Sequence, residues 1–123
     1  MIVLIVEDSI VIRKELVSTL SRILADCNIL QTGNGIEAIN LIRRYEVQVA
    51  IIDIQLPGIN GLEVLRHLKT INPSCLAAIF TNCNHQPYRQ KCAELGADLF
   101  FDKSAEFELM CLALESWFCQ RLI

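Results

Sequence analysis

Two apolar segments of the chain are followed directly by acidic side chains. The run Ile2–Val6 is followed by Glu7 and Asp8, and the run Val49–Ile52 is followed by Asp53. Continuous β-branched runs of this length are typical of buried strands in a parallel sheet. In open α/β sheets, ligands bind beyond the carboxyl ends of the strands, so the three carboxylates stand where chemistry is expected.

Two further polar side chains follow later apolar runs. Thr81 ends the run that starts at Leu76, and Lys103 comes after the short run Asp98–Phe101. Crowded carboxylates repel one another, and a divalent cation or an ammonium group relieves that repulsion. Carboxylates and water suit Mg²⁺, while a hydroxyl and an ammonium can contact anionic oxygens. Together these groups indicate phosphoryl transfer through an aspartyl phosphate on Asp53.

Each of these signals has an ordinary structural explanation when it is taken alone. An acidic pair after a strand is usually a solvated loop or helix-start charge. An isolated aspartate is more often a capping or turn residue than a nucleophile, and a threonine at a strand end usually bonds to the backbone. The functional interpretation therefore depends on the conjunction, in which each group stands at the carboxyl end of its own strand.

The elements that must position these groups alternate between strands and helices. The predicted strands are 2–6, 27–31, 49–52, 76–81 and 98–101, and the predicted helices are 10–24, 36–45, 62–71, 87–95 and 106–120. Five such units require a doubly wound α/β fold, with a five-stranded parallel sheet, right-handed crossovers and five helices on its two faces. The flavodoxin-like order 2-1-3-4-5 suits five units and brings the polar strand ends together.

Composition limits the functions that are open to the chain. Its 123 residues fit one domain, 1–123, and are 53% hydrophobic, which excludes a disordered composition. The net charge of -3 and the pI near 5.3 give no basic surface for nucleic acid. The N-terminal apolar run is too short for a signal peptide or a membrane span, so we expect a cytoplasmic protein. The six cysteines form no Cys-x-x-Cys pair and are expected to be free thiols.

Four motifs carry the polar groups: Val6-Glu7-Asp8, Asp53-Ile-Gln-Leu-Pro57-Gly-Ile-Asn-Gly61, Phe80-Thr81, and Gly96-Ala-Asp98-Leu-Phe-Phe-Asp-Lys103. In this order and spacing they resemble the response-regulator receiver domains of two-component signalling. The resemblance covers residues 2 to 120. It implies a phosphorylation-dependent signalling switch or phosphorelay intermediate, which at most catalyses its own phosphorylation and dephosphorylation.

The resemblance implies a role for each matching residue. Asp53 would accept a phosphoryl group from the phosphohistidine of a histidine kinase or histidine phosphotransfer protein. Asp8 would bind Mg²⁺ directly and Glu7 through water, and Asp53 and the backbone carbonyl of Gln55 would complete the metal site.

The resemblance also implies a readout of phosphorylation. Thr81 and Lys103 match the hydroxyl and the ammonium that contact the phosphoryl oxygens. Phe100 matches an aromatic switch residue that turns inward as Thr81 moves toward the phosphate. A downstream protein target is then expected at the face formed by the fourth helix, the fifth strand and the fifth helix, with no direct contact to nucleic acid or membrane.

Several positions depart from the usual pattern of this family. Glu7 replaces the commoner aspartate, Asn82 stands where a small residue is usual, and Ser104 stands where proline is usual. The last change leaves open whether the peptide bond before residue 104 is cis, because a non-proline cis bond costs about 2.5–4 kcal/mol. Phe100 lacks the hydroxyl of a tyrosine switch, so packing alone must set its position.

The surfaces of the last two predicted helices differ in character. In the fourth, Arg89 and Lys91, with His85 nearby, are interpreted as an ordinary solvated face. In the fifth, one apolar stripe predicts the side that faces the core: Phe107, Met110, Leu114, Trp117 and Phe118. Further apolar residues stand elsewhere on the same helix: Leu109, Leu112, Ala113 and Cys119. This surplus suggests a homodimer or a partner-binding face.

Other readings of the same residues lead to different functions. A phosphatase of the haloacid dehalogenase type also uses an aspartate nucleophile, but in Asp-x-Asp on the first strand, whereas Asp53 is on the third and is followed by Gln55. A degenerate receiver that binds partners without phosphorylation is disfavoured by the intact Asp53, Thr81 and Lys103. A further alternative is that the chain is the receiver fragment of a longer transcriptional or enzymatic response regulator.

Overall fold

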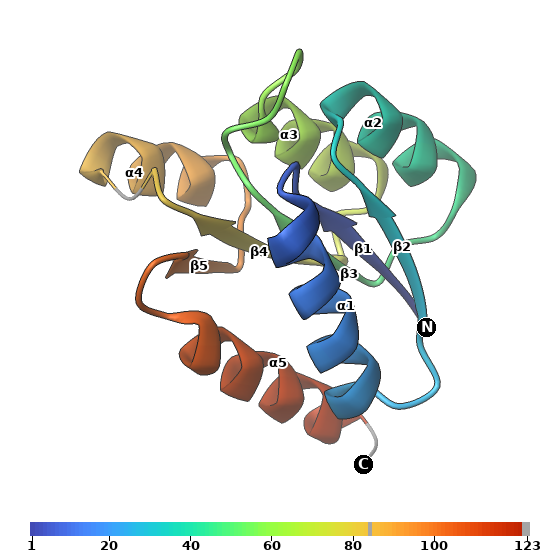
Figure 1. Ribbon diagram of the computed structural model, residues 1–123. Coiled ribbons are helices and arrows are strands. Elements are labelled where there is room, and N and C mark those ends of the chain that lie inside the picture. The colour runs from blue at the N-terminus through green and yellow to red at the C-terminus, as the bar shows by residue number, and fades with distance from the viewer. Residues whose placement is uncertain (84, 122–123) are drawn as a thin grey trace.

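Strands and helices alternate along the computed structural model, which describes residues 1–83 and 85–121 (Figure 1). The elements are β1 (Ile2–Val6), α1 (Ile10–Ile23), β2 (Asn28–Thr32), α2 (Gly35–Arg44), β3 (Val49–Ile52), α3 (Gly61–Ile71), β4 (Leu76–Thr81), α4 (Gln86–Glu94), β5 (Leu99–Asp102) and α5 (Phe107–Arg121). All ten predicted elements are confirmed, with boundaries that differ by one residue at most. Among the described residues, no helix has the length and apolar character that crossing a membrane requires.

The five strands form one parallel sheet in the order β2-β1-β3-β4-β5, which confirms the predicted flavodoxin-like arrangement. α1 and α5 cover one face of the sheet, and α2, α3 and α4 cover the other (Figure 1). The register places Val6 beside Ile52 and Thr81 beside Asp102. The carboxyl ends of β1, β3, β4 and β5 therefore meet at one end of the sheet.

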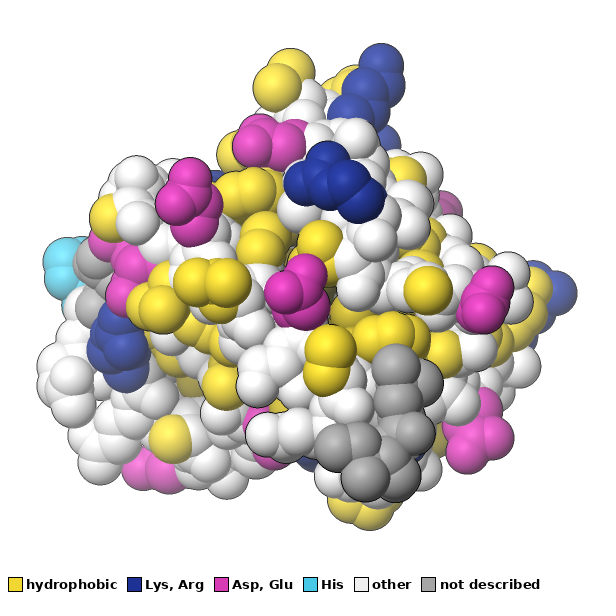
Figure 2. Space-filling view, turned by 90° about the horizontal axis from the view of Figure 1, so that it is seen from below, with side chains coloured by type: hydrophobic (Ala, Val, Ile, Leu, Met, Phe, Trp, Pro, Cys, Tyr) yellow, Lys and Arg dark blue, Asp and Glu magenta, His cyan; other side chains and the backbone are white. Residues whose placement is uncertain are grey.

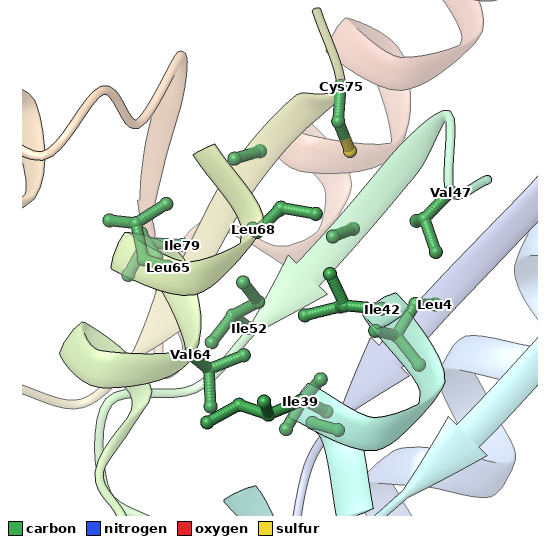
Figure 3. Packing of buried hydrophobic residues seen from close by; sticks show 14 of the residues in the cluster. Leu4, Ile39, Ile42, Val47, Ile52, Val64, Leu65, Leu68, Cys75 and Ile79 are labelled. Carbon is green, nitrogen blue, oxygen red and sulfur yellow. The ribbon is translucent and has the colours of Figure 1, made fainter. Parts of the chain in front are cut away.

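A hydrophobic cluster on each face of the sheet holds the helices in place. On the α2–α3 side, Ile52 of β3 and Leu65 of α3 belong to one continuous cluster (Figure 3). On the α1–α5 side, Leu20 and Leu114 are fully buried against the sheet. Because both faces are covered, the central strands must be apolar throughout, as their sequences are.

The predicted core-facing stripe of α5 is confirmed. Met110 and Leu114 are fully buried, and Phe107, Trp117 and Phe118 are partly buried against the same cluster. The helix nevertheless has apolar side chains on its outer side, since Leu109 and Leu112 are 52% and 64% exposed.

Side-chain caps fix where three helices begin at the carboxyl end of the sheet. Ser9, the N-cap of α1, accepts a hydrogen bond from the Ile12 N–H at 3.3 Å. Asn34 and Asn60 cap α2 and α3 in the same way. Each cap satisfies backbone donors that the first helical turn leaves unpaired. The loops that precede these helices are thereby held in defined conformations.

Lys69 fastens α3 to two loops at the opposite end of the sheet. Its Nζ donates to the carbonyl oxygen of Cys75 at 2.6 Å and to Asp98 Oδ2 at 2.9 Å, and only 12% of its side chain is exposed. The same carboxylate oxygen accepts the N–H of Ala77 at 2.8 Å. Gly96 has a φ of +98° and leaves room for the lysine stem, because a Cβ there would lie 3.2 Å from Lys69 Cγ.

We expect Lys69→Met to lower the free energy of unfolding by roughly 1–3 kcal/mol, because acceptors inside the fold lose their charged donor. Arg66→Met is the matched control on the same helix, since the ion pair of Arg66 with Glu63 is exposed and contributes little. Urea unfolding of both variants measures the difference. Wild-type stability in Lys69→Met would contradict the role given to this lysine.

Candidate functional site

Three carboxylates lie close together at the carboxyl ends of β1 and β3. One oxygen atom each from Glu7, Asp8 and Asp53 lies within 4.8 Å of the other two. The sheet brings them together, because the Asp53 N–H donates to the carbonyl oxygen of Val6 at 3.0 Å and extends the β1–β3 pairing by one residue. Glu7 and Asp53 are buried, at 2% and 4% exposure, whereas Asp8 is exposed.

Lys103 bridges the two buried carboxylates. Its Nζ lies 2.6 Å from Glu7 Oε1 and donates to Asp53 Oδ2 at 2.6 Å. Burial lowers the pKa of the ammonium, but its pairing with the carboxylates of Asp53 and Glu7 outweighs burial, so the pKa of Lys103 is raised. The ammonium is therefore charged at neutral pH and offsets part of the negative charge of the cluster.

The loop after β5 fixes the backbone of Lys103. The Lys103 N–H donates to the carbonyl oxygen of Thr81 at 3.0 Å. The N–H and Oγ of Ser104 both donate to Asp102 Oδ1, at 3.0 and 2.8 Å. The Lys103–Ser104 peptide bond is trans, as are the other peptide bonds of the described residues, which answers the question that the sequence left open.

Glu7 contains a buried oxygen without a hydrogen-bond partner. Its Oε2 accepts the Ser9 N–H at 3.0 Å. Its Oε1 is buried and, among the described residues, makes no hydrogen bond of good geometry, although the Lys103 ammonium is 2.6 Å away. Burial raises the pKa of Glu7, and the charge of Asp53 adds to this, while Lys103 and the Ser9 N–H only partly offset it. Glu7 Oε1 is therefore held by the ion pair with Lys103 rather than by a well-aligned hydrogen bond.

The donor set fits a hard divalent cation. Mg²⁺ prefers oxygen ligands and is often held by one or two carboxylates, with water in its remaining positions. Glu7 Oε1 is buried beside the Lys103 ammonium, Asp8 is exposed, and Asp53 Oδ1 accepts the Gln55 N–H at 3.2 Å. The cluster therefore combines buried and solvent-accessible oxygens, as a partly hydrated ion requires.

The two predicted switch residues lie on neighbouring strands. Thr81 is fully buried at the end of β4, and its Oγ1 accepts the Cys83 N–H at 3.1 Å. Phe100 is partly buried in β5 and packs under α4, where the guanidinium carbon of Arg89 lies 4.4 Å from the ring centroid. The Arg89 side chain is 40% exposed and so lies on the predicted solvated face, but it also stacks on Phe100, a contact that the sequence did not indicate. His85 and Lys91 are exposed as expected.

Arg13 is a second residue near the site that sequence reasoning missed. Its Nη1 donates to the carbonyl oxygen of Glu7 at 2.7 Å, and its Nε donates to Gln31 Oε1 at 3.2 Å. Gly33 makes room for it, because a Cβ there would lie 2.9 Å from Arg13 Nη1 and 3.2 Å from the Cα of Asp8. Arg13 thus holds the backbone that carries the acidic pair. In the sequence, only Gly33 just after a predicted strand and Arg13 in a predicted helix point to this contact. Such residues are too common to predict it.

A cleft of about 520 Å³ opens beside the acidic cluster. Residues from three loops and from α4 line it, among them Asp8, Gln55, Pro57, Cys83 and Tyr88. The cleft reaches the exposed member of the cluster, Asp8, and so gives small ligands a route to the carboxylates. Asn82, which stands where a small residue is usual in the family, is exposed and is not among the residues that line this cleft.

The chain belongs to the response regulator receiver domain family, whose family model matches residues 3–115. It is 37% identical over 114 residues to a cyclic di-GMP phosphodiesterase of Thermotoga maritima, covering 93% of this chain and 30% of that protein. It is 31% identical over 126 residues to the response regulator GacA of Pseudomonas aeruginosa, covering 98% of this chain and 57% of that protein. The structure of a LuxR-family DNA-binding response regulator from Staphylococcus aureus matches with a TM-score of 0.82 and 29% identity, covering 95% of this chain and 98% of that one.

These comparisons confirm the predicted class and fold. The chain is a receiver domain, a signalling domain of two-component response regulators, and its sheet has the order of that fold. It spans less than a third of the first relative and little more than half of the second. The roles of the individual site residues stay predictions.

We expect the isosteric Glu7→Gln variant to be more stable than the wild type at neutral pH in the presence of a chelator. Burial raises the pKa of Glu7 in the folded state, so its charged form is penalised on folding and the neutral amide is not. The gain should shrink as the pH falls through the raised pKa and be lost below the ordinary value of 4.5, where Glu7 is protonated in both states.

Thermal unfolding across this pH range measures the difference. Glu94→Gln is the control, because Glu94 is exposed on α4. A less stable Glu7→Gln protein at neutral pH would mean that the ion pair with Lys103 outweighs the effect of burial.

Proposed function

We propose that the chain is a phosphorylation-dependent signalling switch or phosphorelay intermediate, in which Asp53 accepts a phosphoryl group from a histidine kinase or histidine phosphotransfer protein. The observation that carries the proposal is the buried Asp53 carboxylate, 2.6 Å from the Lys103 ammonium and grouped with two further acids. A carboxylate oxygen of Asp53 attacks phosphorus, and the bond from phosphorus to the donor imidazole nitrogen breaks. The electron pair of that bond stays on the imidazole, which takes up a proton.

The residues around Asp53 would each meet part of the charge that this reaction brings in. Phosphorylation adds about -1.5 to -2 charge. Mg²⁺, held by Glu7 through water, Asp8, Asp53 and the Gln55 carbonyl, would supply electrostatic stabilisation to the transferring group. Lys103 turns from a carboxylate toward a phosphoryl oxygen.

The same event would move the switch residues. The Thr81 hydroxyl can donate to a phosphoryl oxygen, and its movement would leave space that Phe100 fills by turning inward. A local change in charge is thereby converted into a change in the surface of β5. The protein would act as a switch that at most catalyses its own phosphorylation and dephosphorylation.

A second candidate is a receiver fragment of a longer transcriptional or enzymatic response regulator. The coverage of the relatives favours it, since the chain spans 30% and 57% of two of them. The chemistry proposed for Asp53 is the same in both cases, and residues 1–123 form the receiver domain in both. A cytoplasmic location belongs to either proposal and is consistent with the six free cysteines.

We expect incubation with acetyl phosphate and Mg²⁺ to add one phosphoryl group to the wild-type protein, and Asp53→Asn to abolish the addition. Intact-protein mass spectrometry measures the gain, and a chelator should prevent it. Asp26→Asn is the matched control, because Asp26 is exposed, lies outside the cluster and has a φ of 57° that asparagine accepts. An unmodified wild-type protein, or equal modification of Asp53→Asn, would contradict the proposal.

We propose in addition that a downstream protein target binds the face formed by α4, β5 and α5, and that a homodimer can use the outer side of α5. The exposed Leu109 and Leu112 support an interaction at α5. Figure 2, which views the molecule from below, shows hydrophobic side chains between scattered Asp and Glu on this side. A contiguous apolar patch on the outside of a helix can serve as a partner surface.

For the homodimer, we expect the wild-type protein with Mg²⁺ and beryllofluoride to sediment as a dimer at tens of micromolar, and Leu112→Lys to sediment as a monomer. The charge would be buried without a partner in the dimer. Ile36→Lys is the control, because Ile36 is comparably exposed, at 53%, on α2. A monomeric wild-type protein with and without beryllofluoride would rule out the homodimer.

A further inference from the structure

Arg89 connects the switch aromatic to the loop that carries the site lysine. Its guanidinium carbon lies 4.4 Å from the centroid of the Phe100 ring, and its Nη2 lies 3.9 Å from Glu106 Oε1. The same Oε1 accepts the N–H of Asp102 at 2.8 Å. A continuous set of contacts therefore runs from α4, over the face of Phe100, to the residue that precedes Lys103.

The contact between Arg89 and Phe100 stabilises one position of the ring. A guanidinium over an aromatic face is attracted by the ring quadrupole. Arg89 is only partly exposed, with 40% of its side chain accessible, so solvent screens the attraction incompletely. Glu106 Oε1 lies 3.9 Å from Arg89 Nη2, a partly exposed ion pair that contributes little. In this structure the Phe100 ring therefore stacks on the Arg89 guanidinium as well as packing, partly buried, against the hydrophobic cluster on the α2–α3 side.

We propose that Arg89 is a latch that holds Phe100 outward and so opposes switching. The inference rests on the proposed function, in which the Phe100 ring is turned inward when Asp53 is phosphorylated. A ring that turns inward leaves the guanidinium, so the contact exists in one state only and biases the equilibrium toward that state. Arg89 thus shifts the equilibrium between the two positions of Phe100, and with it the affinity for a phosphoryl group, without contacting that group.

Titration of Mg²⁺-saturated protein with beryllofluoride, an analogue of the phosphoryl group, tests the latch. Arg89→Met keeps an apolar stem and removes the charge, and it should bind beryllofluoride roughly two- to fivefold more tightly, the factor that one partly exposed cation–π contact corresponds to. Arg89→Lys keeps a cation and should lie between Arg89→Met and the wild type. Unchanged or weaker binding by Arg89→Met overturns the proposal.

The Glu106→Gln variant distinguishes the effect of the Arg89–Phe100 stack from that of the Arg89–Glu106 ion pair. Glutamine keeps a side-chain acceptor for the Asp102 N–H but removes the charge that faces Arg89. Because a partly exposed ion pair contributes little, this variant should change beryllofluoride binding less than Arg89→Met does. An effect of Glu106→Gln as large as that of Arg89→Met would overturn the assignment of the latch to the stack.

Side-chain NMR gives a readout that a purely structural role would not move. In the free wild-type protein, the side-chain protons of Arg89 should show ring-current shifts from Phe100, and these should disappear at saturating beryllofluoride. Shifts that persist at saturation overturn the latch. If the wild type does not bind beryllofluoride, the proposed function fails and the latch with it. If the wild type binds and Arg89→Met binds equally, the latch alone fails.

Discussion

The placement of one ammonium group between two buried carboxylates is the interaction on which the site depends. Glu7 and Asp53 come from different strands, and Lys103 reaches both at 2.6 Å from a third. Without this charge, the repulsion between the neighbouring carboxylates would be left uncompensated. The parallel sheet makes the arrangement possible, because its strand order brings the ends of β1, β3 and β5 to the same end of the molecule.

Two lysines of this fold show how similar burial serves different purposes. Lys69, with 12% of its side chain exposed, is surrounded by carbonyl oxygens and one carboxylate, and all of its contacts are made in the resting protein. Lys103, with 10% exposed, lies between two charges, one of which has an oxygen without a hydrogen bond. The first arrangement is fully satisfied and stabilises the fold. The second pairs the ammonium with two acids of the candidate site.

The strands and the site acids could be predicted because their signals are local. An apolar β-branched run such as Ile2–Val6 predicts a buried strand of a parallel sheet. A carboxylate that follows it directly then lies at the strand end. The contacts of Arg89 with Phe100 and of Arg13 with Glu7 could not be predicted. They depend on the distance between a helix and a strand or loop and on side-chain rotamers, and an arginine in a helix looks the same whether it faces water or a ring.

The bond from the Lys103 N–H to the Thr81 carbonyl ties two site residues into a single backbone ladder. Any residue added or lost within β5 would turn side chains to the opposite face and carry the ammonium away from the carboxylates in the same step. The α1–β2 connection, residues 24–27, contributes no residue to the Lys103–Thr81 bond or to the acidic cluster. Length variation among descendants of this chain is therefore expected to accumulate at the amino end of the sheet, while β4 and β5 change by substitution only.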